Sequence, residues 1–193
     1  MTKKHSPTKD KILQSTRLLL STHGFENTTI DDILTTAGIT KGAFYHHFKN
    51  KESLCEAVLE QVIGDFKKLA GQIDESLSPI EQLDFFISKI LYLNSAGQWV
   101  NCNLMLKLSS EPLESHLPIK ETLGQFWQWY TNFYRELLTK CREKNLISKT
   151  FSLEMQIQVI LSMLAGSILI KPVNNEIPSH KEIASAIIKM LNS

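Results

Sequence analysis

Three helix-start signals and one helix-stop signal fall within residues 28–52. Thr29 is followed three residues later by an aspartate, the spacing of a capping box at a helix N-terminus. Gly38 stands where a helix C-terminus favours a left-handed residue, and Thr40 can cap the helix that follows it. Asn50 can cap a third helix that begins directly after it. The segment therefore predicts two short helices joined by a tight turn, and the start of a third helix.

Apolar residues recur in this segment at the spacing of one helix face, which would turn that face toward a core. They are Ile30, Ile33, Leu34 and Ala37. Ile39 and Phe44 flank Thr40 as a hydrophobic staple, which fixes the angle between the two helices. The second helix then presents small, cationic and hydrogen-bonding residues outward: Lys41, Gly42, Tyr45 and His46. Such a face is typical of a helix that enters the DNA major groove.

The stretch from about Asp10 to Leu54 resembles the DNA-binding domain of the TetR family of bacterial transcriptional regulators. The residues that carry the resemblance are Gly24-Phe25, Ala37-Gly38, Lys41-Gly42, Tyr45, Phe48 and Lys51-Glu52. The resemblance implies an all-α protein. It would have an N-terminal three-helix helix-turn-helix domain and a C-terminal helical bundle that binds a ligand and dimerises. Beyond residue 60 the resemblance is one of length and helical texture, so it does not indicate a ligand.

We predict that the second helix and its flanks contact double-stranded DNA. Lys41, Tyr45 and His46 are expected to meet the DNA, with Thr40, Lys49 and Lys51 on backbone phosphates. Thr29, Gly42 and Ala43 complete the predicted contact set. The chain as a whole carries a net charge of only +1, but residues 1–51 contain eight Lys and Arg against four Asp and Glu, a balance of +4. A small excess of this kind is also common on ordinary solvated surfaces.

The rest of the chain also reads as helices, with no sustained period-two alternation, internal repeat or low-complexity segment. Helix-start residues, proline and glycine positions predict helices over about 7–23, 50–73, 79–96, 102–110, 119–144, 152–170 and 179–191. Apolar spacing predicts the inner faces of two of them: Ile12, Leu13, Thr16, Leu19 and Leu20 in the first, and Leu83, Phe86, Ile87, Ile90 and Leu91 in the third. Pro112 and Pro118 are expected to bracket a loop, and Pro172 and Pro178 to isolate the last connection. We expect a helix-turn-helix domain over 1–51, a connector helix over about 50–73, and a regulatory and dimerisation domain over 74–193.

In TetR relatives the last two long helices pair with those of a second subunit, which here implies a homodimer through 152–170 and 179–191. An apolar stripe and a run of small residues are compatible with close helix approach: Ile157, Ile160, Leu161, Leu164 and Ile168, with Ala165-Gly166-Ser167. The alternative is that these residues fill the core of a monomer.

The helix over 119–144 is unusually aromatic, and TetR relatives keep an effector cavity among these helices. We predict an apolar or aromatic ligand in contact with Phe66, Phe86, Trp99, Asn103, Gln125, Trp129, Tyr130 and Phe133. An aromatic stripe on a helix is more often plain core.

Enzyme motifs are absent from the sequence: it has no phosphate-binding glycine loop, HExxH, GxSxG or paired cysteines. His46 and His47 are adjacent and are expected to diverge on a helix, so we predict no metal site. Three unpaired cysteines and the lack of an apolar N-terminal run indicate a reducing cytoplasm, without a disulfide framework or membrane span. Cys102 opens a short helix, where a thiolate would be stabilised and reactive; the alternative is a plain buried thiol.

The function that follows is a ligand-responsive transcriptional regulator without a cofactor. We expect a repressor that leaves a pseudo-palindromic operator when an apolar or aromatic small molecule binds the C-terminal domain. The alternative is a helical enzyme or adaptor that has recruited a helix-turn-helix.

Overall fold

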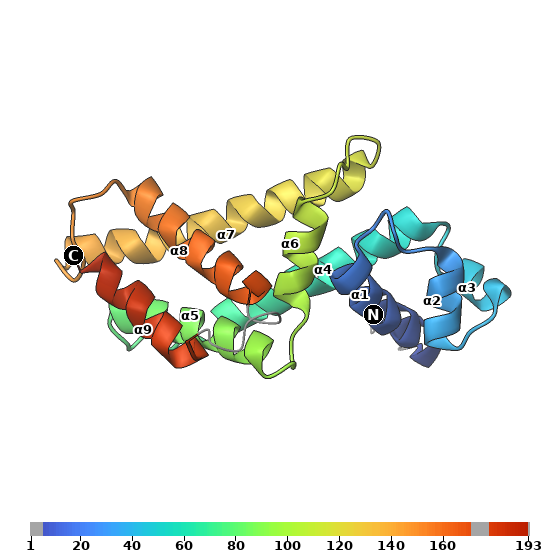
Figure 1. Cartoon of the computed structure of the whole chain (residues 1–193), viewed down its shortest axis with the longest axis horizontal. Coiled ribbons are helices and arrows are strands. Elements are labelled where there is room, and N and C mark those ends of the chain that lie inside the picture. The colour runs from blue at the N-terminus through green and yellow to red at the C-terminus, as the bar shows by residue number, and fades with distance from the viewer. Residues whose placement is uncertain (1–5, 171–177, 193) are drawn as a thin grey trace. The chain divides into compact units, whose positions relative to one another are not determined.

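The computed structural model describes residues 6–170 and 178–192, and within them every regular element is an α-helix (Figure 1). The helices are α1 (Pro7–His23), α2 (Ile30–Ala37), α3 (Lys41–His47), α4 (Lys51–Ala70), α5 (Pro79–Ser95), α6 (Asn101–Ser109), α7 (Leu117–Glu143), α8 (Leu153–Ile170) and α9 (His180–Leu191). The predicted all-α class is confirmed.

These helices form two compact units that are not contiguous in sequence. The first unit contains the described residues up to Gly64 together with Asn103–Gly124, and the second contains Asp65–Cys102 and the described residues from Gln125 onward. Most of α6 and the first turns of α7 thus group with the N-terminal helices. The division into a helix-turn-helix domain over 1–51, a connector helix over about 50–73 and a regulatory domain over 74–193 stays a prediction.

The core of the first unit forms where α1 packs against α2 and α3. The predicted inner face of α1 is buried as expected: Ile12, Leu13, Thr16, Leu19 and Leu20. Ile33 of α2 and Phe44 of α3 are fully buried beside it. Gly24, with φ 83°, ends α1 as predicted. One inward stripe on each short helix thus fixes α2 and α3 against α1.

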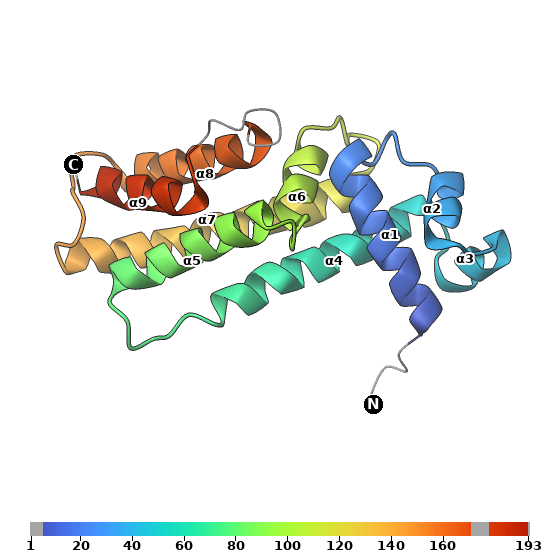
Figure 2. The same ribbon diagram turned by 60° about the horizontal axis from the view of Figure 1, so that its bottom comes forward.

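In the second unit α5 packs against α8 and α9, which lie side by side (Figure 2). Helix α5 begins at Pro79. Glu81 in its first turn accepts hydrogen bonds from the backbone N and the hydroxyl of Ser78, at 2.8 and 2.6 Å. Its inner face matches the predicted positions: Leu83, Phe86, Ile87, Ile90 and Leu91 are buried.

Several predicted boundaries differ from the structure. The helix α4 ends at Ala70 rather than near residue 73. Pro118 lies in the first turn of α7 rather than in the preceding loop, because the first turn of a helix tolerates a residue without an N–H group. Pro172 lies outside the described residues.

Candidate nucleic-acid interface

Local hydrogen bonds set the start and end of α2. The backbone N of Asp32 donates to Oγ1 of Thr29 at 3.1 Å, and the backbone N of Thr29 donates to Oδ2 of Asp32 at 2.9 Å. The hydrogen bond from the Thr29 side chain, followed by that from its backbone, lowers the pKa of Asp32. Gly38 ends the helix in the left-handed conformation, with φ 62° and ψ 44°. The predicted capping box and glycine cap are both confirmed.

The second helix of the motif, α3, is fixed in the same way. Oγ1 of Thr40 accepts a hydrogen bond from the backbone N of Ala43 at 3.3 Å. The helix ends at His47, because Phe48 adopts an extended conformation. Asn50 caps α4 as predicted, since its Oδ1 accepts from the backbone N of Ser53 at 2.8 Å. The predicted succession of caps therefore produces the helix-turn-helix.

The outer face of α3 is exposed and polar, as expected of a helix that reads DNA. Tyr45 is 49% exposed. The other exposed members of the predicted contact set are Thr29, Thr40, Lys41, Gly42, His46 and Lys49, whereas Ala43 is half-buried. Phe44 faces the opposite way and is fully buried, so packing fixes which residues face outward.

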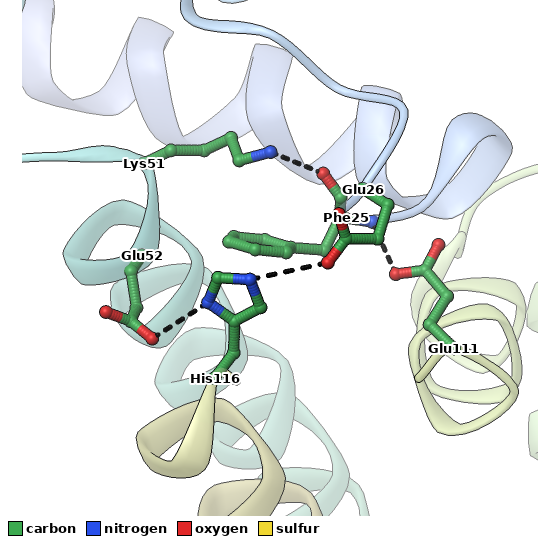
Figure 3. A network of polar contacts seen from close by, with 6 residues as sticks. All are labelled: Phe25, Glu26, Lys51, Glu52, Glu111 and His116. Atoms are coloured by element: carbon green, nitrogen blue, oxygen red, sulfur yellow. Dashed lines mark hydrogen bonds and ion pairs between the residues drawn. The ribbon is translucent and has the colours of Figure 1, made fainter. Parts of the chain in front are cut away.

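Three residues of this region differ from expectation. The rings of His46 and His47 lie edge to face at 4.9 Å rather than diverging, although no cluster able to hold a metal ion occurs among the described residues. Nζ of Lys51 donates to the backbone O of Phe25 at 2.7 Å and lies 4.1 Å from the centre of its ring (Figure 3). Lys51 therefore supports the α1–α2 turn rather than projecting toward a phosphate as predicted.

The predicted effector residues fall into two groups. Phe66, Phe86 and Tyr130 are buried in an aromatic cluster of the second unit, and Trp99, Trp129 and Phe133 are half-buried at its edge. Ring centres lie 4.8 Å apart for Phe66 and Trp99 and 4.3 Å apart for Phe86 and Phe133. Because the rings touch one another, the cluster packs as core in this structure, which is the alternative that the sequence left open.

The two polar residues predicted for the effector site do not join this cluster. Gln125 is exposed, and Asn103 belongs to the first unit. Asn101 is fully buried instead, and its Nδ2 donates to Oδ2 of Asp65 at 3.2 Å. Sequence reasoning missed a groove of about 850 Å³ between α5 and α9, which is lined by Phe85, Tyr92, His180 and Ile188 among others.

Cys102 does not have the surroundings of a reactive thiol. Its side chain is buried, and burial raises the pKa of the thiol to about 12. Burial likewise raises the pKa of Cys55 to about 12 and that of Cys141 to about 11. Desolvation of the thiolate outweighs the helix N-terminus, so the expectation of a reactive Cys102 is corrected to that of a buried thiol.

The apolar stripe of α8 also has a different role from the predicted one. Ile157, Ile160, Leu164 and Ile168 are buried within the chain, as the monomer-core alternative has it. Apolar side chains on other faces are exposed instead, among them Met155, Leu169 and Ile170. At 18 residues with a mean hydropathy of 1.7, α8 is long and apolar enough to cross a membrane, although the sequence predicts no membrane span. Core helices of soluble proteins also meet this criterion.

Comparison with known proteins identifies the N-terminal motif. Residues 12–58 match the family model described as bacterial regulatory proteins, tetR family. The HTH-type transcriptional repressor KstR2 of Mycolicibacterium smegmatis is 37% identical over 76 residues, which cover 39% of this chain and 37% of that protein. The fatty acid metabolism regulator protein of Bacillus subtilis (strain 168) is 20% identical over 99% of this chain and 97% of its own length.

Similarity of fold extends beyond the motif. The structure of AibR in complex with isovaleryl coenzyme A and operator DNA has a TM-score of 0.79 and 19% sequence identity, with 96% of this chain and 98% of that chain covered. The resemblance first drawn from residues of the helix-turn-helix is thereby confirmed. Residues 12–58 thus carry the DNA-binding motif of the TetR family of bacterial regulatory proteins, and the whole chain is similar to transcriptional regulators.

Proposed function

We propose that this protein is a cytoplasmic repressor that binds a pseudo-palindromic operator as a homodimer and is released by an apolar small molecule. The observation that carries the proposal is the outer face of α3, where Lys41, Tyr45 and His46 are exposed on a helix whose orientation is fixed by Phe44. One such helix covers a half-site only, so a symmetric dimer is needed to read a full operator.

Exposed apolar residues on α8 and α9 support the dimer. Met155, Leu169 and Met190 are each at least half exposed, which is costly for a monomer in water. Between the two helices a groove of about 520 Å³ is lined mainly by small and apolar residues, including Gly166 and Ala186. Small residues allow the helices of a second subunit to approach closely. A dimer would also explain why a helix of membrane-spanning length occurs in a DNA-binding protein.

The aromatic cluster is the region through which we propose that the effector acts. Phe66 of α4 contacts Trp99, Phe126 and Tyr130, and α4 begins directly after the helix-turn-helix. A ligand that separates these rings would tilt α4 and change the distance between the two recognition helices of the dimer. The ligand must bind the two conformations with different affinities, because equal affinity shifts no equilibrium.

The experiment begins by selecting an operator from a random-sequence duplex library with the wild-type protein. Acyl-CoA thioesters of increasing chain length are the first effector probes, since a structural neighbour is described with isovaleryl coenzyme A. A thermal-shift screen would find binders, and gel shifts would measure operator affinity with and without each. Release should change affinity by about 5- to 150-fold. Failure to enrich any duplex, or a tight binder that leaves operator affinity unchanged, would refute the corresponding part of the proposal.

Two variants of α7 locate the effector. Trp129 lies at the edge of the cluster, with its ring centre 6.0 Å from that of Phe133. Trp129→Ala should weaken effector binding by about tenfold or more, because an aromatic contact surface is lost. Gln128→Ala is the control, since Gln128 is an exposed residue of the same helix. Equal loss in both variants would indicate a general defect of the helix.

A further inference from the structure

The α1–α2 turn at Phe25 is held by charged side chains from two other segments (Figure 3). The backbone N of Phe25 donates to Oε2 of Glu111 at 2.8 Å, and its backbone O accepts from Nζ of Lys51 at 2.7 Å. Hydrogen bonds to charged groups are stronger than neutral ones. Both main-chain groups of one turn residue are therefore bonded to ionic side chains, one of them 86 residues away in sequence.

His116 adds a second set of contacts to the same turn. Its Nε2 lies 3.3 Å from Oε1 of Glu26, and its Nδ1 lies 3.2 Å from Oε1 of Glu52. Its ring also meets that of Phe25 edge to face at 4.6 Å. Only the doubly protonated ring can donate hydrogen bonds to both carboxylates, since neutral imidazole has a single N–H group. We call Phe25, Glu26, Lys51, Glu52, Glu111 and His116 the turn network.

The two distant members of the turn network come from one short segment, the connection between α6 and α7. Leu113, between Glu111 and His116, is 3% exposed and anchors the segment within the first unit. Glu111 reaches the turn at Gly24, which has no side chain to keep it away. The connection is thus seated on the turn through buried and ionic contacts together.

The turn leads directly into the DNA-contacting helices. Oγ1 of Thr28, a fully buried residue, donates to the backbone O of Gly24 at 2.6 Å, and Thr29 then caps α2. In the other direction His116 immediately precedes α7, a continuous helix that carries Phe126, Tyr130 and Tyr134 of the aromatic cluster. A packed helix moves largely as a rigid element, so a displacement of α7 would move His116 against the turn.

We infer that Glu111 and His116 are positioning residues for operator binding. They hold the α1–α2 turn, and with it α2 and α3, in the arrangement described here, and effector-driven displacement of α7 lowers DNA affinity by loosening these contacts. The inference rests on the proposed function for the operator and the effector. Besides α4, the α6–α7 connection then forms a second route between the aromatic cluster and the recognition helix.

The first test compares two carboxylates of the same connection in the full-length protein. Glu111→Ala removes the acceptor for the Phe25 amide, whereas Glu114→Ala removes an exposed carboxylate that lies 3.5 Å from Nζ of Lys120. Amide hydrogen exchange of Phe25, followed by NMR, should accelerate in Glu111→Ala and stay unchanged in Glu114→Ala. Operator affinity should fall about fivefold in Glu111→Ala. Glu111→Gln, which keeps an acceptor oxygen, should recover part of both effects.

The second test replaces His116, whose ring lies between Glu26 of the turn and Glu52 of α4 and meets the ring of Phe25. His116→Ala removes all three contacts, so it should accelerate exchange of the Phe25 amide and lower operator affinity about fivefold. Lys120→Ala, at an exposed residue whose Nζ lies 3.5 Å from Oε1 of Glu114, should change neither. Unchanged exchange and unchanged affinity in His116→Ala would overturn the positioning role of His116.

Each outcome decides a separate point. Unchanged Phe25 exchange in Glu111→Ala would overturn the turn network as a source of order. Accelerated exchange with unchanged operator affinity would overturn the positioning role. An equal loss of affinity in Glu111→Ala and Glu114→Ala would show that the effect comes from the loss of a negative charge in general. That result would also overturn the positioning role. If the wild type binds no duplex at all, the proposed function fails, while the exchange measurement still tests the turn network.

Discussion

A Cβ atom on Gly24 would overlap with Oε1 of Glu111. The carboxylate therefore occupies the space that a side chain would need, and the backbone of Gly24, with φ 83° and ψ −175°, is one that essentially only glycine adopts. Both constraints come from the same position, where α1 ends and the turn toward α2 begins. Glu111 of the α6–α7 connection thus packs against the α1–α2 turn at Gly24.

Gly24→Ala should therefore destabilise the protein by about 1–3 kcal/mol through backbone strain and should also expel Glu111 from the turn. Gly38→Ala is the control, because Gly38 also has a positive φ of 62° but no atom within 4 Å of a built Cβ. Urea denaturation measures both. We expect the effects of Gly24→Ala and Glu111→Ala to be non-additive, since either one removes the Phe25–Glu111 hydrogen bond. Strict additivity would show that the close approach has no energetic consequence.

The recognition helix should contribute both affinity and salt dependence. Lys41→Ala is expected to weaken operator binding about tenfold. It should also reduce the slope of log affinity against log salt concentration by about one, the value for one phosphate contact. Lys68→Ala is a matched loss of charge at an exposed site of α4 outside the predicted contact set. Gel-shift titration at several salt concentrations distinguishes them. If Lys41→Ala and Tyr45→Ala together leave affinity unchanged, α3 is not the recognition helix.

The proposed dimer face should be sensitive to charge. Leu169 of α8 and Leu117 of α7 are similarly exposed, at 60% and 58%, but only Leu169 belongs to the predicted interface. Leu169→Glu should shift the protein toward monomer at micromolar concentration, because an unpaired charge would be buried in the interface. Leu117→Glu should remain dimeric. Light scattering measures the masses, and a monomeric wild type would contradict the interface.

Labelling with iodoacetamide should reveal three slow thiols. Since the pKa of each cysteine is raised by burial, the reactive thiolate is scarce near neutral pH and increases as the pH rises. We expect Cys141, whose pKa of about 11 is lowest, to react before Cys55 and Cys102 as the solution is made alkaline. Mass spectrometry of the native protein identifies the order. Selective modification of Cys102 near neutral pH would restore the idea of a sensing thiol.

Acid should weaken three helix N-termini together. Hydrogen bonds from the capping hydroxyls of Thr29, Ser78 and Ser179, and then from their backbone N–H groups, lower the pKa values of Asp32, Glu81 and Glu182. A lowered folded-state pKa means that the stabilisation is complete above the unfolded pKa. It is lost as pH falls through the folded value. Urea midpoints should decline below about pH 4, and Glu182→Gln should reduce that decline, whereas Glu121→Gln should not.

The sequence by itself determined the elements whose causes are local. Thr29, Gly38, Thr40 and Asn50 each act on backbone groups within a few residues, so their spacing was sufficient to predict α2, the turn, α3 and the start of α4. Periodicity likewise identified the inner faces of α1 and α5. These features depend on helix geometry, which is the same in any fold.

Tertiary structure decided what depends on residues far apart in the chain. Nothing near Glu111 or His116 in sequence indicates Phe25 as a partner, and nothing near Lys51 indicates that its Nζ bonds to Phe25 rather than to a phosphate. The stripe of α8 could face either a core or a second subunit, because periodicity specifies a face without specifying its partner. Burial of Cys102 depends on surrounding helices in the same way. Contacts of this kind follow from packing, which no local pattern encodes.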